Sequence, residues 1–166
     1  MKLWGIISVV LADLMYIFYI KAKKHTELKN IHDLILFIQY VNVNVLERKM
    51  TLYNSVIDTK EKVSSYIDGF VEFFCNTADI LNVRKSLVKA IDVYFSDTDE
   101  KIRANIKEYL LILGNTDKKT SMDYYRVMYD ECEKIFTNKK EELEKSIKII
   151  SVLTYGLSSM AILVLI

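Results

Sequence analysis

The chain has 166 residues, enough for one domain of ordinary size with a buried core. Its 23 lysines and arginines are balanced by 22 aspartates and glutamates, which excludes both the basic field of a typical nucleic-acid-binding protein and an acidic tail. With no proline and only four glycines, the composition argues against a turn-rich sheet protein and favours an all-α fold.

The first element is an apolar stretch, LWGIISVVLADLMYIFYI, over residues 3–20, and Asp13 is its one charge. A membrane-spanning helix needs about 20 mostly apolar residues, with a lower limit near 17. An alternative is a signal peptide cleaved after Ala12. The apolar run continues beyond that point, however, which favours a transmembrane helix.

Three amphipathic helices are predicted next, because apolar residues recur at three- and four-residue spacing. They cover residues 25–50, which continue from the first span, then 59–81 after a short link, and then 83–95. The predicted core positions of the second and third helices are Val63, Ile67, Phe70, Phe74, Ala78, Leu81, Leu87, Ile91 and either Tyr94 or Phe95.

Residues 96–114 predict a further helix with recognisable ends. Asp97 stands three residues before Glu100, as in a variant of the capping box, and Gly114 stands where a left-handed residue ends a helix. The apolar stripe of this helix comprises Ile102, Ile106, Tyr109, Leu110 and Leu113.

The last helix is predicted to be long and to be capped by Thr116 or Asp117. Helical spacing of apolar residues continues from Met122 to Ile147 and runs into residues 149–166, an uncharged apolar end. We therefore expect one helix of about 50 residues, some 75 Å long. Its end is predicted to be a second transmembrane helix.

Lysines near the two predicted spans indicate the orientation, because cytoplasmic flanks carry an excess of Lys and Arg. The lysines on the inner side of the spans are Lys21, Lys23, Lys24, Lys29, Lys139, Lys140, Lys145 and Lys148, whereas only Lys2 lies outside. The sequence thus predicts a transmembrane helix over 1–20, a cytoplasmic helical bundle over 21–148 and a transmembrane helix over 149–166. Both termini would be extracytoplasmic.

Asp13 would be costly if it faced lipid, so it should face protein or water. Small and polar residues, which allow membrane helices to approach closely, lie near it and along the second span. They are Gly5, Ser8 and Ala12 in the first span and Ser151, Thr154, Ser158 and Ala161 in the second. Two hypotheses stay open: Asp13 bonds to Ser158, Ser159 or Thr154 of the same chain, or it contacts another subunit.

No catalytic or cofactor motif accompanies this pattern. His25 and His32 have no cysteine nearby, and Cys75 and Cys132 match no metal-ligand spacing. There is no phosphate-binding glycine loop, zinc-protease signature or nucleophile elbow. We therefore expect no enzyme activity, no metal and no cofactor, and a role in binding or assembly.

The layout resembles the stage III sporulation protein AB family of endospore-forming bacteria. The resemblance rests on the short first span beginning MKLWG, the Leu-Gly-x-x-Asp turn formed by Leu113, Gly114 and Asp117, and the long last helix with Lys148 before an apolar end. Members of this family have a cytoplasmic domain similar to those of the type II secretion system F platform protein.

The resemblance implies a component of the transenvelope channel complex between mother cell and forespore, in the mother-cell membrane around the forespore. Its partners would be the assembly ATPase, stage III sporulation protein AA, and other membrane proteins of the complex. A homo-oligomer is one expectation from the same analogy, and two short spans suit a monomer as well.

Four cations are candidates for the partner-binding surface by charge alone: Arg84, Lys85, Lys118 and Lys119. A solvated surface is the alternative interpretation for each. The alternative function is a membrane-anchored helical sensor, regulator or scaffold unrelated to sporulation, and a sensor would need an apolar pocket with convergent polar groups.

Overall fold

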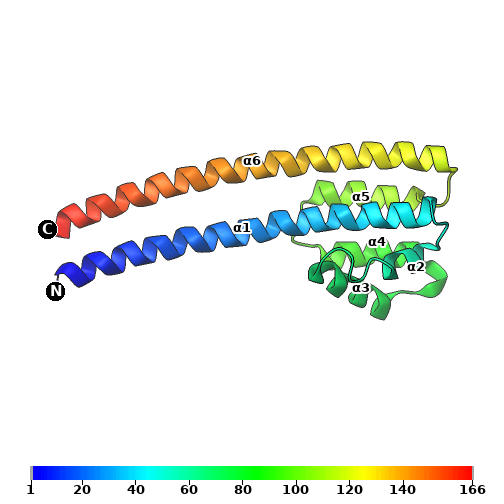
Figure 1. Cartoon of the computed structure of the whole chain (residues 1–166), viewed down its shortest axis with the longest axis horizontal. Helices are drawn as coiled ribbons and strands as arrows, with labels where there is room; N and C mark the ends of the chain where they lie inside the picture. Colours follow the sequence, from blue (N-terminus) through cyan, green and yellow to red (C-terminus); the bar gives the residue numbers. More distant parts are fainter. Residues whose placement is uncertain (1, 166) are drawn as a thin grey trace. The chain divides into compact units, whose positions relative to one another are not determined.

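The computed structural model describes residues 2–165, with side chains at residues 8, 10–79, 81–156 and 158–160. The regular elements are α1 (Lys2–Leu46), α2 (Leu52–Ile57), α3 (Ser65–Thr77), the 3-10 helix η1 (Ile80–Asn82), α4 (Val83–Tyr94), α5 (Glu100–Ile112) and α6 (Lys118–Leu165). Figure 1 shows two long helices, α1 and α6, and the short helices between them in sequence. The predicted all-α fold is confirmed, since the described residues contain no strand.

The chain forms two compact units. The first unit is Met1–Leu28 together with Thr137–Ile166, and the second is Lys29–Phe136. Within its described residues the first unit contains only the beginning of α1 and the end of α6, whereas the second contains a bundle of helices. The predicted continuity of both long helices is confirmed.

A search of the described residues for helices with an apolar stretch sufficient to cross a membrane finds none. The predicted spans, 3–20 and 149–166, include Gly5, Ala161 and other residues whose side chains lie outside the described ones. The two spans and the domain boundaries drawn from them stay predictions.

Side-chain caps determine where the short helices begin, because the first backbone N–H groups of a helix lack partners within it. Thr51 accepts a hydrogen bond from the Asn54 backbone at the start of α2, a helix missing from the sequence prediction. Asp99 caps α5 by accepting from the backbone N–H groups of Lys101 and Ile102. The predicted cap, Asp97, is wrong by two residues, because the chain enters the helix only after Thr98.

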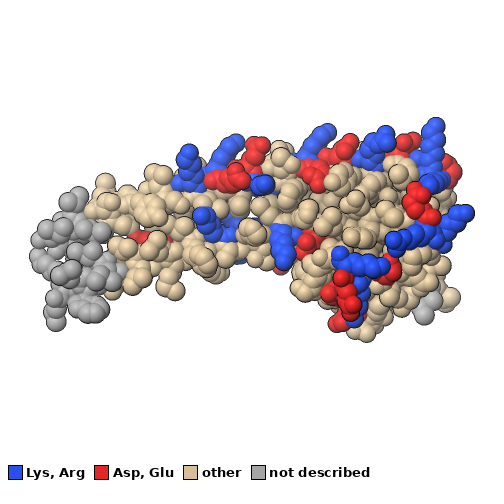
Figure 2. Space-filling view, viewed as in Figure 1, with Lys and Arg blue, Asp and Glu red and all other residues tan. Residues whose placement is uncertain are grey.

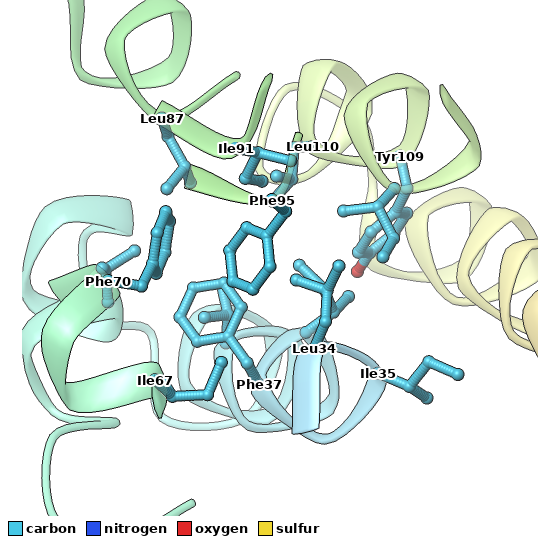
Figure 3. Close-up of a cluster of buried hydrophobic side chains, with 14 of the residues drawn as sticks. Leu34, Ile35, Phe37, Ile67, Phe70, Leu87, Ile91, Phe95, Tyr109 and Leu110 are labelled. Atoms are coloured by element: carbon cyan, nitrogen blue, oxygen red, sulfur yellow. The ribbon is translucent and has the colours of Figure 1, made fainter. Parts of the chain in front are cut away.

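The core of the second unit is aromatic and aliphatic (Figure 3). The Phe70 ring meets the edge of Phe37 at a centroid distance of 5.3 Å and lies 4.9 Å from the ring of Phe95. Leu34, Leu87, Ile91 and Leu110 surround them and are fully buried. Because these side chains come from α1, α3, α4 and α5, their burial holds the four helices together.

Leu81 is the clear exception among the predicted core positions. Helix α3 ends at Thr77, Ala78 is extended, and Asp79 caps η1 by accepting a 3.0 Å hydrogen bond from the Leu81 backbone. These changes take Leu81 out of the helical register of α3, and its side chain is 91% exposed. The prediction that Leu81 belongs to the core is wrong.

Candidate functional site

The two helices of the first unit are antiparallel, and polar contacts join their described residues. The Ser158 hydroxyl donates a hydrogen bond to the Asp13 carboxylate. Further along, the Lys24 ammonium donates to the Ser146 hydroxyl over 3.3 Å, and Lys139 lies 3.6 Å from Glu27. We call the line of half-buried residues that includes Asp13, Thr154 and Ser158 the Asp13 seam.

The Ser158 hydroxyl also lies 2.8 Å from the backbone carbonyl of Thr154. A hydroxyl has one proton, so Ser158 donates either to Asp13 or to Thr154 at any moment. The Ser158 hydroxyl thus lies between the Asp13 side chain of α1 and the Thr154 backbone carbonyl of α6.

Toward the chain ends, the described outer surface of this unit is strongly apolar. Met15, Phe18 and Met160 are 73%, 75% and 69% exposed, whereas the polar residues Asp13, Ser151 and Ser158 are half-buried. Figure 2 shows that the described surface toward the chain ends is almost free of charged side chains. Large apolar side chains are thus exposed around a seam that holds both polar and apolar residues, an arrangement unusual for a helix pair in water.

Of the predicted packing residues, Asp13 and Ser158 are joined across the two helices, whereas Thr154 contacts Ser158 within α6 through its backbone carbonyl. Ser8 and Ala12 are exposed. The seam instead continues along α1 through Ile17, Ile20 and other half-buried residues at helical spacing. Packing of these helices within a bilayer stays a prediction.

A second cluster lies at one end of the bundle, where α5 stops and α6 starts. Arg84, from the first turn of α4, donates to the carbonyl of Leu110 over 3.0 Å and to that of Leu113 over 2.7 Å. The last carbonyls of a helix have no partner inside it, so the Arg84 guanidinium completes the end of α5. Gly114 follows with φ of +76°, as predicted for this turn.

Asp117 begins α6 and confirms one of the two predicted caps. Its carboxylate accepts from the Thr120 backbone N–H at 3.0 Å and from the Thr120 hydroxyl at 2.7 Å. These hydrogen bonds hold the pKa of Asp117 below its ordinary value, with the backbone bond as the larger cause. Next to it, Lys118 pairs with Glu47 over 2.9 Å, which ties α6 to the chain after α1.

The four predicted partner-binding cations thus differ in their surroundings. Arg84 is half-buried and engaged with carbonyls of α5, and Lys118 forms an ion pair, whereas Lys85 and Lys119 are exposed. Sequence reasoning missed the structural role of Arg84, because its two acceptors are 26 and 29 residues away. It also missed the exposed side chain of Leu81 beside these cations.

Within the described part of the chain, no group of three His, Cys, Asp or Glu side chains is arranged to hold a metal ion. His25 is exposed, and the His32 ring lies 5.8 Å from that of Phe136. Cys132 is fully buried and Cys75 is exposed. Comparisons with family models, curated proteins and solved structures find no match to this chain.

Proposed function

We propose that the chain is a non-enzymatic membrane platform protein of the stage III sporulation protein AB type. In this proposal, residues 1–20 and 149–166 anchor it in the mother-cell membrane around the forespore, and residues 21–148 are cytoplasmic. The helical middle binds the assembly ATPase, stage III sporulation protein AA, within the channel complex. The function is thus assembly and anchoring.

The observation that carries this proposal is the exposure of large apolar side chains toward the chain ends of the first unit, around the hydrogen-bonded Asp13 and Ser158. Water favours apolar side chains inside and polar ones outside, yet Phe18 is exposed while Asp13 and Ser158 face one another. A bilayer reverses the preference, because lipid solvates the apolar side chains and leaves the polar groups to pair. The Asp13 seam is what a pair of membrane helices needs.

The charge distribution along the same helices supports the boundary of the anchor. Among the described side chains, exposed lysines begin at Lys21 on α1, and on α6 they end at Lys148. Tyr19 and Tyr155 lie near these positions and are exposed, as is common for aromatic side chains at a membrane surface. The transition from charged to apolar surface therefore falls at matching places on the two helices.

Cys75 provides a direct test of the proposed topology, because its thiol is exposed whereas Cys132 is buried. The full chain would be produced in growing cells, and protoplasts would be treated with a membrane-impermeant maleimide. We expect Cys75 to react only after the membrane is permeabilised, and a cysteine added after Ile166 to react in intact protoplasts. The Cys75→Ser variant, which lacks the exposed thiol, measures the background labelling.

Reaction of Cys75 in intact protoplasts would overturn the orientation. Recovery of the chain in the soluble fraction after cell breakage would overturn membrane anchoring itself. Expression of the gene in sporulating mother cells is a separate expectation, and equal expression in growing cells would argue against the sporulation role.

A further inference from the structure

Two grooves on the surface of the second unit differ in the sign of their charge. The first, which we call the Leu81 groove, has a volume of about 410 Å³ and is lined by Leu52, Leu81, Val83, Arg84, Lys85 and Leu111 among others. Leu81 is 91% exposed at its edge. Arg84 and Lys85 are the charged residues of its lining, so the groove combines an apolar surface with positive charge.

The second, the Glu131 groove, lies between α5 and α6 and has a volume of about 210 Å³. Its lining includes Asn105, Glu108, Tyr109, Tyr124, Val127 and Glu131, and its charged residues are the two glutamates. Val127 is 60% exposed and Tyr124 is 47% exposed. This groove therefore offers apolar side chains with negative charge.

The two grooves of one molecule cannot meet each other. Helix α5 contributes Leu111 to the Leu81 groove, together with α2 and α4, and Glu108 to the Glu131 groove, together with α6. The grooves thus open on different sides of α5. Contact between them requires two copies of the chain.

We infer that the Leu81 groove of one copy binds the exposed α6 stripe of a second copy, formed by Tyr124, Val127 and Glu131. These three residues share one face of α6, because they are spaced at three and four positions. Leu81 packs against the apolar side chains of the stripe, and Arg84 and Lys85 lie opposite the glutamates of the second copy. Both halves of this complementary interface are present in each chain.

Such a contact is head-to-tail, since each copy uses a different surface on its two sides. Repetition of a head-to-tail contact builds a ring when the rotation closes and a filament when it does not. The inference goes beyond binding of an ATPase and does not depend on it. It also accounts for the high exposure of Leu81, Tyr124 and Val127 in the single chain.

Mixed single-cysteine variants test the contact in the full-length protein reconstituted in lipid vesicles. All would include Cys75→Ser, which removes the exposed native thiol, while Cys132 is buried. We expect a mixture of Leu81→Cys and Val127→Cys chains to form disulfide-linked dimers under mild oxidation. The matched control is Val93→Cys mixed with Val127→Cys, since Val93 is 55% exposed on α4 and lines neither groove.

Charge exchange separates this contact from random collisions. In the same mixture, Lys85→Glu or Glu131→Lys in every chain should lower the crosslinked fraction by on the order of tenfold, because like charges then meet. Both changes together should restore most of the crosslinked fraction, because opposite charges then face one another again with their positions exchanged. All these positions are exposed, so unchanged thermal unfolding confirms that the variants fold.

Three results would overturn the inference. The first is a mixture of Leu81→Cys and Val127→Cys chains that forms no more disulfide-linked dimer than the control mixture of Val93→Cys and Val127→Cys chains. This result is also expected if the groove binds a different protein. The second is crosslinking of Leu81→Cys chains with one another alone, which indicates a symmetric dimer. The third is a double variant, Lys85→Glu with Glu131→Lys, whose crosslinked fraction is no higher than that of either single variant.

Discussion

The Ser158 hydroxyl donates a hydrogen bond to the Asp13 carboxylate, across 145 positions of sequence. The acid in the middle of the first apolar stretch thus has a partner in the last apolar stretch. The contact gives the Asp13 side chain a partner on the neighbouring antiparallel helix. Between the same two helices, the Lys24 ammonium donates to the Ser146 hydroxyl.

Removal of either partner should weaken helix pairing in a coupled way. We expect a double-mutant cycle with Asp13→Leu and Ser158→Ala to give a coupling of about 1 kcal/mol, the usual net contribution of an intramolecular hydrogen bond. The measurement is denaturation of the full chain in detergent. Ala12→Leu is the control, since Ala12 is exposed. Fully additive effects would show that the pair contributes nothing.

Arg84 is expected to act on stability through the end of α5. Arg84→Met keeps the apolar stem and removes both hydrogen bonds to the Leu110 and Leu113 carbonyls, so it should cost about 1 to 3 kcal/mol. Lys85→Met, at the exposed neighbouring position, should stay within about 0.5 kcal/mol. Equal effects of the two variants in chemical denaturation would contradict the role assigned to Arg84.

Gly114 tests the turn between α5 and α6. A Cβ at this position would lie 3.7 Å from the nearest atom of Val45 and 3.9 Å from that of Arg84, so there is room for it. Gly114→Ala should lower the free energy of unfolding by about 1 kcal/mol, and the positive φ alone should cause this loss. Gly114→Asn should cost less, because asparagine tolerates this conformation. Wild-type stability of Gly114→Ala in thermal unfolding would refute the argument.

Alkaline pH should destabilise the bundle. Burial raises the pKa of Cys132 from 9.0 to about 12, and burial also raises the pKa of Tyr125 from 10.0 to about 12. The unfolded chain therefore loses these protons at a lower pH than the folded chain, so stability is full below about pH 9 and falls as pH rises toward 12.

The pH prediction can be checked with denaturation midpoints measured from about pH 8 to about pH 11. Cys132→Ala removes one of the buried groups with a raised pKa and should flatten the decline, whereas Cys75→Ala, at an exposed thiol, should leave the slope unchanged. An identical slope for Cys132→Ala and the wild type would contradict the contribution of the buried thiol.

Periodic patterns predicted the long elements and most of the core. Ile102, Ile106, Tyr109, Leu110 and Leu113 are all buried, as their spacing indicated, and α6 runs through 48 residues without a break. These predictions succeed because a long amphipathic stretch with a good cap has few alternatives. The turn at Gly114 was found for the same reason, since glycine marks a left-handed end.

Short elements and long-range contacts could not be predicted from the sequence pattern. Helix α2 has six residues, too few to show a period, and only Thr51 signals its start. Leu81 continues the helical spacing of α3, yet Asp79 starts a new turn before it. The pairing of Arg84 with α5 joins residues distant in sequence, and no local pattern encodes such a bond.

Binding of the assembly ATPase to vesicles that contain the full chain tests the central proposal most directly. Purified stage III sporulation protein AA from the same organism would be sedimented with these vesicles, with residues 21–148 facing outward, and with empty vesicles of the same lipids. We expect saturable co-sedimentation that requires the chain and weakens with Lys119→Glu. Equal sedimentation with empty vesicles would contradict the proposal.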